Sequence, residues 1–230
     1  MVERLQTFLF VFKSKDRRKW SWLSSLLCST LLVLLFCDDA HTCDCGSKAV
    51  GCAPDTGKCF CNTKGYVGDR CDECDNRNHY YADVHNKACY YELAVDYQYT
   101  FNLSKKEDRH LSAINFRNAP VKPDVDADFN ITCSSHARMN LTVRTKGDPT
   151  ERTLLSNVNC THFKYKFTKS EHAFGSEDNV TLTTFFVYVY DFKPPLWIQV
   201  SFAQYPKLNV EQLITTLGTL SVLQGLRGGQ

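Results

Sequence analysis

Cysteine is the residue type best placed to do chemistry in this sequence. Eight of the twelve cysteines lie between Cys43 and Cys89, with the spacing C-x-C-x6-C-x6-C-x-C-x9-C-x2-C-x14-C. Thiolates in such a cluster could bind zinc, exchange disulfides with a substrate, or form structural cross-links. The choice between these chemistries depends on whether the segment faces a reducing or an oxidising compartment.

A zinc site is the first alternative. Cys71 and Cys74 form a C-x2-C pair, and His79 and His85 follow it. Structural zinc sites usually take a second pair of ligands at similar spacing, whereas the other cysteines here come as C-x-C pairs that are too close to bind one metal comfortably. A thioredoxin-type redox motif would need a βαβ pattern around the C-x2-C pair, and the sequence has none. An intracellular zinc-binding protein that uses Cys71 and Cys74 therefore stands as the alternative to a disulfide scaffold.

The first 37 residues indicate the compartment. Residues 1–19 form a basic N-terminal region, and residues 20–37 are apolar and carry no charge. A basic flank before an apolar run directs a chain to the secretory membrane. The run lacks a clean cleavage site and just reaches the length of a membrane span, so a cleaved signal peptide and an uncleaved signal-anchor transmembrane helix both remain open. Either way, residues 43–230 are expected to face an oxidising lumen or the cell exterior.

Residues 43–89 resemble a laminin-type EGF-like module. The resemblance rests on all eight cysteines, on the segment "TGKCFC" and on the G-x-x-G-x-x-C-x-x-C element that begins at Gly65. A segment this short buries little apolar area, so cross-links would replace a core. The segment before Cys43 lacks the glutamate of calcium-binding EGF modules, and we expect no metal. The resemblance implies four disulfides: Cys43–Cys52, Cys45–Cys59, Cys61–Cys71 and Cys74–Cys89.

The chain after Cys89 reads as strands. In "YELAVDYQYTFNL", Tyr91 to Leu103, apolar and polar residues alternate without a break, which predicts one half-buried strand. Seven such strands separated by turn-rich loops predict an antiparallel β-sandwich over residues 90–205. Cys133 shares its inward phase with Phe129 and Ile131, and we expect it to pair with Cys160 inside the core. The other six strands are predicted at 110–116, 129–133, 138–145, 163–167, 180–192 and 197–203.

Five N-x-S/T triplets predict N-glycosylation. Those at Asn102, Asn130 and Asn140 fall on the polar phase of their strands, where a glycan could stand in solvent. The triplet at Asn159 adjoins the expected core disulfide. The five predicted sites are Asn102, Asn130, Asn140, Asn159 and Asn179.

Two further segments extend the resemblance. "CYYELAVDYQYTFNLSKKEDRHLSAINF" and "TFFVYVYDFKPPLWIQVSFAQ" are similar to the membrane-proximal ectodomain of the attractin family, which directly follows laminin-type EGF modules. The resemblance covers about residues 43–205 and implies a glycosylated cell-surface or secreted protein involved in cell interaction or receptor signalling. The family's CUB, propeller and lectin-like domains are absent from this sequence. The tail, residues 206–230, holds fifteen uncharged residues between Glu211 and Arg227, too few and too polar for a membrane span.

Composition and motifs argue against an enzyme or a nucleic-acid-binding protein. The formal net charge of +2 gives no reason to expect a polyanionic partner. The sequence contains no nucleophile elbow, phosphate-binding loop, dinucleotide fingerprint or zinc-protease motif, so we expect no catalytic residue, no cofactor and no small-molecule substrate. Tyr80, Tyr81 and Tyr90, near the junction of the two regions, are expected to pack the regions together rather than form a ligand-binding face.

The sequence thus predicts a mainly β chain of five regions. A basic region (1–19) and a hydrophobic helix (20–37) precede the laminin-type EGF-like module (43–89), the antiparallel β-sandwich (90–205) and the tail (206–230). The expected function is that of a non-enzymatic extracellular or cell-surface glycoprotein that serves as a spacer and protein-interaction module. Its partners would be extracellular or membrane proteins, with direct membrane attachment through residues 20–37 if that helix is not cleaved.

Overall fold

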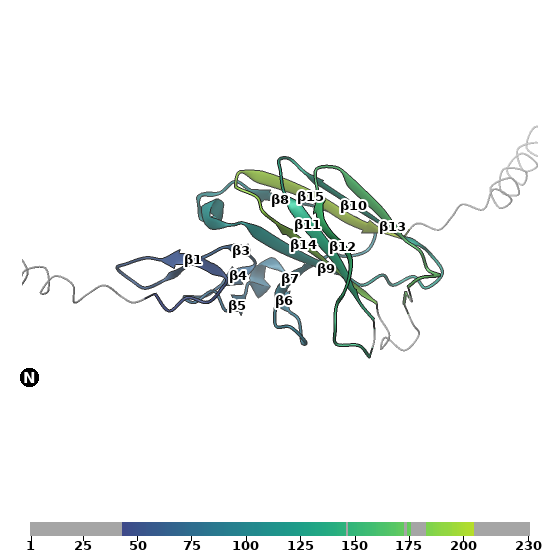
Figure 1. The fold of residues 1–230 in the computed structure, drawn as a ribbon, viewed down its shortest axis with the longest axis horizontal. Coiled ribbons are helices and arrows are strands. Elements are labelled where there is room, and N and C mark those ends of the chain that lie inside the picture. The colour runs from purple at the N-terminus through teal and green to yellow at the C-terminus, as the bar shows by residue number, and fades with distance from the viewer. Residues whose placement is uncertain (1–42, 146, 173, 176–182, 205–230) are drawn as a thin grey trace, which may run out of the picture. The chain divides into compact units, whose positions relative to one another are not determined.

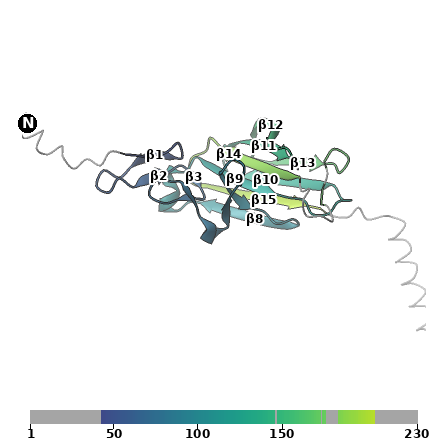
Figure 2. The same cartoon turned by 90° about the horizontal axis from the view of Figure 1, so that it is seen from below.

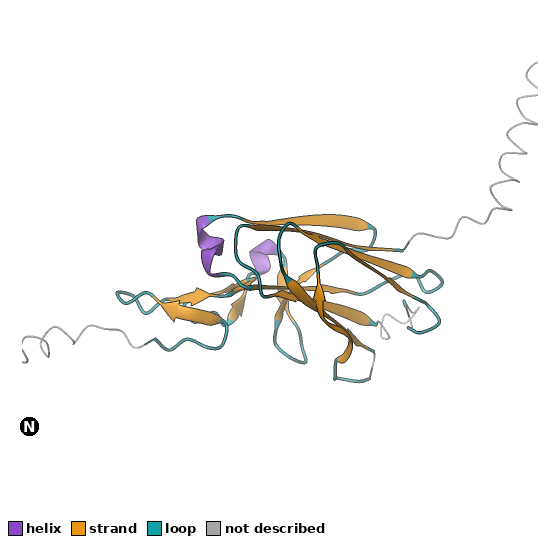
Figure 3. Ribbon diagram, turned by 45° about the horizontal axis from the view of Figure 1, so that its top comes forward, coloured by secondary structure: helices purple, strands orange, loops and turns teal. Residues whose placement is uncertain are grey.

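A computed structural model describes residues 43–145, 147–172, 174–175 and 183–204. These residues are mainly β, with fifteen strands and two short 3₁₀ helices (Figure 3). The predicted hydrophobic helix at 20–37, the basic region before it and the tail at 206–230 lie outside the described residues. In the described part of the chain, no helix is long and apolar enough to cross a membrane.

Two compact units can be separated. One contains residues 43–53 and all the described residues from Lys58 onward. Among the described residues, the other contains Pro54–Gly57, of which residues 54–56 form a turn. The disulfide-rich segment and the sandwich therefore belong to the same unit.

The disulfide-rich segment is built from very short strands around sulfur. Its small core consists of cysteines and Tyr66, as expected of a segment with too few apolar residues for a core of its own. Gly65 is required at a close approach, because its φ is +90° and an added Cβ would lie 2.0 Å from the ring of Tyr80. The elements are β1 (Ala49–Cys52), β2 (Cys59–Cys61), β3 (Thr63–Lys64), β4 (Tyr66–Val67), β5 (Glu73–Cys74), η1 (Asn76–Asn78) and β6 (Tyr80–Ala82).

Two sheets form the sandwich (Figures 1 and 2). The four-stranded sheet has the order β13-β10-β15-β8 and is antiparallel throughout. The seven-stranded sheet has the order β12-β11-β14-β9-β7-β6, with β3 also paired to β9. The remaining elements are β7 (Cys89–Glu92), β8 (Tyr97–Leu103), η2 (Lys106–His110), β9 (Ala113–Asn118), β10 (Ala127–Cys133), β11 (Arg138–Arg144), β12 (Arg152–Asn159), β13 (Phe163–Phe167), β14 (Thr184–Tyr190) and β15 (Leu196–Ala203).

The seven-stranded sheet is not purely antiparallel, which corrects the prediction. β3 pairs with β9 in parallel through Thr63 and Ala113, and β7 pairs with β9 in parallel through Tyr91 and Phe116. The two strands thus follow one another along the same side of β9. After β7 the chain crosses to the other sheet as β8 and returns to the seven-stranded sheet as β9, running in the direction of β7, so the β7–β9 pair is parallel. β3, β6 and the start of β7 all precede residue 90, so the disulfide-rich segment supplies part of the sandwich.

The predicted single strand from Tyr91 to Leu103 is wrong. It consists of two strands in different sheets, β7 and β8. The break lies at Asp96, whose φ is +62° and whose amide donates a hydrogen bond to the carbonyl of Phe202. Both sheets face the same core, so the alternation continues across the crossover and the pattern does not reveal it. β12 was also missed, because its apolar residues do not alternate.

The main core lies between the sheets and is strongly aromatic. Phe167 packs on Phe185 with ring centroids 4.0 Å apart, and Phe129 packs on Phe202 at 4.7 Å. All four rings are fully buried. The side chains of Cys133 and Cys160 lie in the same core, so Cys133 does point inward from its strand as predicted.

His172 is buried at one end of this aromatic core. Its ring lies 5.2 Å from the centroid of Phe185 and 5.8 Å from that of Phe167, and its Nδ1 has no hydrogen-bond partner among the described residues. Burial disfavours the imidazolium form and lowers the pKa of His172. The charge of Arg152 acts in the same direction, while that of Glu171 opposes it.

Acid should therefore destabilise the fold through His172. Because the pKa is lower in the folded state, the unfolded chain takes up the proton first, and stability is lost as the pH falls below about 6.5. We expect the free energy of unfolding, measured by urea titration, to fall between pH 7 and pH 5.5 in the wild type and to fall less in His172→Phe and His172→Leu. The exposed His136→Gln is the control and should keep the wild-type dependence. If both His172 variants kept the wild-type pH dependence of the free energy of unfolding, the loss of stability in acid could not be attributed to His172.

Candidate interaction surface

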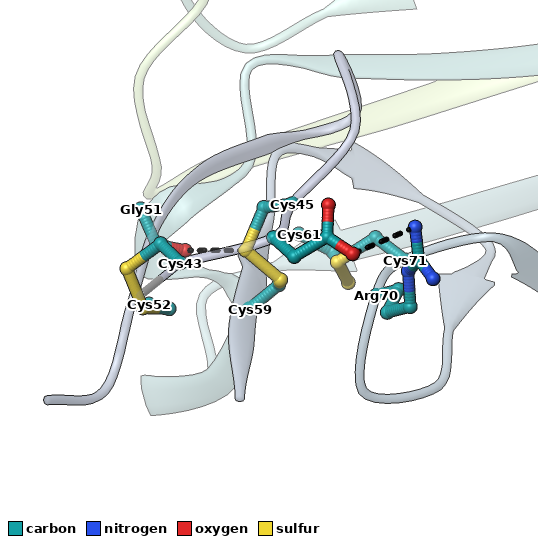
Figure 4. The surroundings of a disulfide bond; sticks show 9 residues. Cys43, Cys45, Gly51, Cys52, Cys59, Cys61, Arg70 and Cys71 are labelled. Carbon is teal, nitrogen blue, oxygen red and sulfur yellow. Dashed lines mark hydrogen bonds and ion pairs between the residues drawn. A yellow bond between two sulfur atoms is a disulfide. The ribbon is translucent and has the colours of Figure 1, made fainter. Parts of the chain in front are cut away.

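Five disulfides link the described cysteines. They join Cys43 to Cys52, Cys45 to Cys59, Cys61 to Cys71, Cys74 to Cys89 and Cys133 to Cys160, with Cα atoms 5.5 to 5.8 Å apart. Figure 4 shows three of the four bonds in the disulfide-rich segment. An ion pair of 3.1 Å between Arg70 and Asp44 lies beside them.

The disulfides argue against the zinc alternative. Cys71 is bonded to Cys61 and Cys74 to Cys89, so neither half of the C-x2-C pair is a free thiolate. Within the ranges that the structure describes, no group of three or more His, Cys, Asp or Glu residues is arranged to hold a metal ion.

Four of the five sequons lie in the described residues, and Asn179 lies outside them. Asn102 and Asn159 are exposed, while Asn130 and Asn140 are half-buried. The Oδ1 atom of Asn159 accepts hydrogen bonds from the backbone amide and the hydroxyl of Thr161, 2.9 and 2.6 Å long. Glycosylation at all five positions stays a prediction.

One set of contacts between the disulfide-rich segment and the sandwich surrounds η2. Lys64 donates a 2.7 Å hydrogen bond to the carboxylate of Asp108, whose side chain is 2 % exposed. Phe60 stacks on His110 with ring centroids 4.7 Å apart. The carbonyl of Asn62 accepts hydrogen bonds from the amides that lead into β9. The chain at 60–64 is thereby fastened to the start of β9.

A second set of contacts surrounds Tyr90. Tyr80 and Tyr90 are buried, as expected of residues that pack the two regions together, and Tyr81 remains 37 % exposed. The hydroxyl of Tyr90 lies 2.6 Å from that of Tyr188, which donates to the carboxylate of Glu151. Asn86 donates to both Tyr90 and Glu151. Burial raises the pKa of Tyr90 to about 12 and raises that of Tyr188 further, so both phenols stay protonated.

The turn between β6 and β7 is held by a buried ion pair. Asp83 and Arg144 form a bidentate contact, with side chains 3 % and 11 % exposed. Burial alone would raise the pKa of Asp83, but the hydrogen bonds and charge of Arg144, with the amides of His85 and Asn86, lower it to about 2. The guanidinium of Arg144 also lies 4.6 Å above the ring of Phe186.

An open groove lies where β7 and β8 approach at one edge of the two sheets. We call it the tyrosine groove, and its lining is His79, Tyr81, Tyr91, Glu92, Tyr97 and Tyr99. The ring of Tyr91 meets that of Tyr99 edge to face at 5.4 Å, and Tyr97 lies 4.8 Å from Tyr99. Burial, followed by the nearby phenols of Tyr99, Tyr97 and Tyr81, raises the pKa of Tyr91. The four tyrosines thus line one groove, with the rings of Tyr91, Tyr97 and Tyr99 in contact.

A match to residues 90–204 decides the family. A family model described as attractin GBD-like matches residues 90–204, half of the 230 residues. The chain belongs to the attractin GBD-like family. Similarity to a curated protein extends beyond that match, because protein tag-53 of Caenorhabditis elegans is 39 % identical over 179 residues, a stretch that covers 73 % of this chain.

The chain spans 13 % of the length of tag-53. The solved pre-peptidase C-terminal domain of collagenase from Bacillus anthracis aligns with 48 % of this chain and 91 % of its own, at 11 % identity and a TM-score of 0.31.

Sequence reasoning missed several residues of this surface, part of which lies in the attractin GBD-like match. Tyr91, Tyr97 and Tyr99 were expected to point into a core, yet Tyr97 is 60 % exposed. The sequence did hold one signal of partial exposure: three tyrosines stand at core-facing strand positions that aliphatic residues usually occupy. Tyrosine combines an apolar ring with a hydroxyl that favours water. The pair of Asp83 and Arg144 carried no local signal, because 61 residues separate its members.

Proposed function

We propose that this chain is a non-enzymatic extracellular or cell-surface glycoprotein that acts as a rigid spacer and protein-interaction module. The observation that carries the proposal is the continuity of the disulfide-rich segment with the sandwich sheet. The parallel pairing of β3 with β9, the antiparallel pairing of β6 with β7 and the buried ion pair of Asp83 and Arg144 join them. A joint of that kind opposes hinge motion and would hold surface residues of both regions at fixed separations.

The proposed location rests on the disulfides. Five of them in one chain persist only in an oxidising compartment. This supports a secretory route, a laminin-type EGF-like identity for residues 43–89, and a signal peptide or signal anchor at 20–37. Sequons on exposed or half-buried asparagines agree with a glycoprotein of that route.

Protein partners at the cell surface fit this chain better than a substrate. Among the described residues, the single ion pair of a histidine with a carboxylate joins His136 to Asp191 at 3.6 Å, and both side chains are largely exposed. Such a solvated pair lacks the burial that usually shifts catalytic groups. We therefore propose extracellular or membrane proteins as partners, as expected for cell interaction or receptor signalling.

Secretion from a eukaryotic host tests the proposal. The protein should appear in the medium or on the cell surface with its thiols protected from alkylation and with the five disulfide-linked peptides in a non-reducing digest. Glycosidase should collapse a heavy, diffuse gel band, and Asn102→Gln should remove one increment of mass. The same chain expressed in a reducing cytosol is the control. Alkylated cysteines, stoichiometric zinc or an unshifted band in the secreted product would count against the proposal.

A further inference from the structure

We propose that the tyrosine groove binds an arginine side chain presented by a protein partner. This inference rests on the proposed function, because it names the chemistry of one contact that an interaction module would make. The groove is lined by four tyrosines, one histidine and one carboxylate, and no lysine or arginine is among its lining residues.

The arrangement of the rings suits a planar cation. Tyr91 presents its ring to Tyr99 at an interplanar angle of 71°, and Tyr97 is tilted against Tyr99 by 54°. Rings inclined to one another in this way line the groove with aromatic surface in more than one orientation. The face of an aromatic ring is the negative part of its quadrupole, so it attracts a cation placed over it. A guanidinium can stack on one face while its N–H groups reach neighbouring hydroxyls.

The charge of the groove points the same way. Glu92 lies at its rim with a side chain that is 56 % exposed, and its Oε2 atom accepts a 2.8 Å hydrogen bond from Arg117. A carboxylate has room for more than one donor, and its Oε1 accepts no hydrogen bond from the residues described. A second arginine could therefore bind that oxygen from the groove side. The positive charge of Arg117 weakens the attraction of Glu92 for a second arginine, so the tyrosine rings must provide the rest of the binding energy.

Covering the edge of the hydrophobic core explains only some of the four tyrosines in the tyrosine groove. Tyr91 and Tyr99 pack against the core cluster, so they have that role already. Tyr97 is 60 % exposed and Tyr81 37 %, more than sealing a core requires. Asn102 is in the opposite phase of β8 from Tyr97, so a glycan there would point away from the groove. The exposed rings are thus left accessible to a partner.

A pair of synthetic peptides tests the inference. The probe is fluorescein-labelled Gly-Arg-Gly-Arg-Gly, and the control carries citrulline, which keeps the shape of arginine and lacks its charge. Fluorescence anisotropy of the secreted, fully disulfide-bonded chain should show binding of the arginine peptide, with the citrulline peptide at least about fivefold weaker. Tyr97→Ala and Glu92→Gln should each weaken binding about threefold. Trp197→Ala, which removes an exposed aromatic ring from β15, is the matched control and should leave affinity unchanged.

The other outcomes are informative as well. Equal binding of both peptides, no binding of either, or an equal loss in Trp197→Ala would overturn the inference. Tighter binding of a neutral oligosaccharide such as cellotetraose, lost in Tyr97→Ala, would assign the groove to carbohydrate instead. Because the test uses secreted protein with its thiols already shown to be bonded, any of these results leaves the proposed function standing. Free thiols in that protein would instead contradict the proposed function, before the groove is tested at all.

Discussion

Replacing Tyr90 with alanine is expected to destabilise the fold by about 3–5 kcal/mol, the usual cost of removing a large buried aromatic side chain. Tyr90 is fully buried, packs on Phe186 at 5.0 Å and shares hydrogen bonds with Asn86 and Tyr188. For a folded unit of this size the loss corresponds to a fall in melting temperature of roughly 10 °C. Differential scanning calorimetry of the secreted protein measures it directly.

Two further variants separate the causes. Tyr90→Phe keeps the ring and removes the hydroxyl, so it should cost about 1–3 kcal/mol, mainly from the hydrogen-bond partners left behind. Tyr97→Ala removes an exposed tyrosine at the first position of β8 and should leave the melting temperature within about 1 °C of the wild type. A Tyr90→Ala protein that melts with the wild type would show that the two regions do not depend on this contact.

The second large effect is expected from Arg144→Met. Removing the guanidinium leaves the carboxylate of Asp83 buried without its partner, a change that typically costs about 3–5 kcal/mol. The double variant Asp83→Asn with Arg144→Met should recover much of that loss, because no unpaired charge remains. Urea unfolding of the four proteins in the cycle gives the coupling energy.

The pH dependence of this effect follows from the low pKa of Asp83. In the wild type the folded pKa of about 2 lies below the unfolded value of 3.8. The ion pair therefore stabilises fully above about pH 4, and the stabilisation is lost as the pH falls toward 2. The cost of Arg144→Met should accordingly be greatest near neutral pH and shrink below pH 4. Lys166→Met breaks the exposed pair with Asp128 and should cost less than about 1 kcal/mol. Equal losses in both variants would contradict the special role of the buried pair.

Much of the fold could be predicted because burial leaves a periodic trace. β10, β11, β13 and β15 lie within two residues of their predicted bounds, since each has one face in the core and one toward water. The sheet to which a strand belongs leaves no such trace. The residues from Tyr91 to Leu103 alternate in one phase although the chain changes sheets at Asp96. The parallel pairings of β9 were also invisible, because they depend on the path of the chain rather than on residue types.

The candidate surface was predictable in smaller part. Tyr80 and Tyr90 were expected at the junction from their position beside Cys89, and their burial agrees with that. Arg144 reaches Asp83 from a strand that was predicted correctly, but a lone outward arginine on a strand usually faces solvent. Burial of its partner depends on the turn between β6 and β7 folding over the sheet, which is a tertiary effect with no local pattern.

The parallel pairing of β3 with β9 has a consequence for biosynthesis. At about 5–20 residues per second, the ribosome finishes β3 roughly 3–10 s before β9. During that interval β3, and later β7, exist without the strand that will pair with them, and unpaired strand edges invite aggregation. The bonds Cys61–Cys71 and Cys74–Cys89 adjoin β3 and include the first residue of β7. Oxidation of the first-made segment would thus preassemble a template on which the later sheet is completed, so the order of folding follows the order of synthesis.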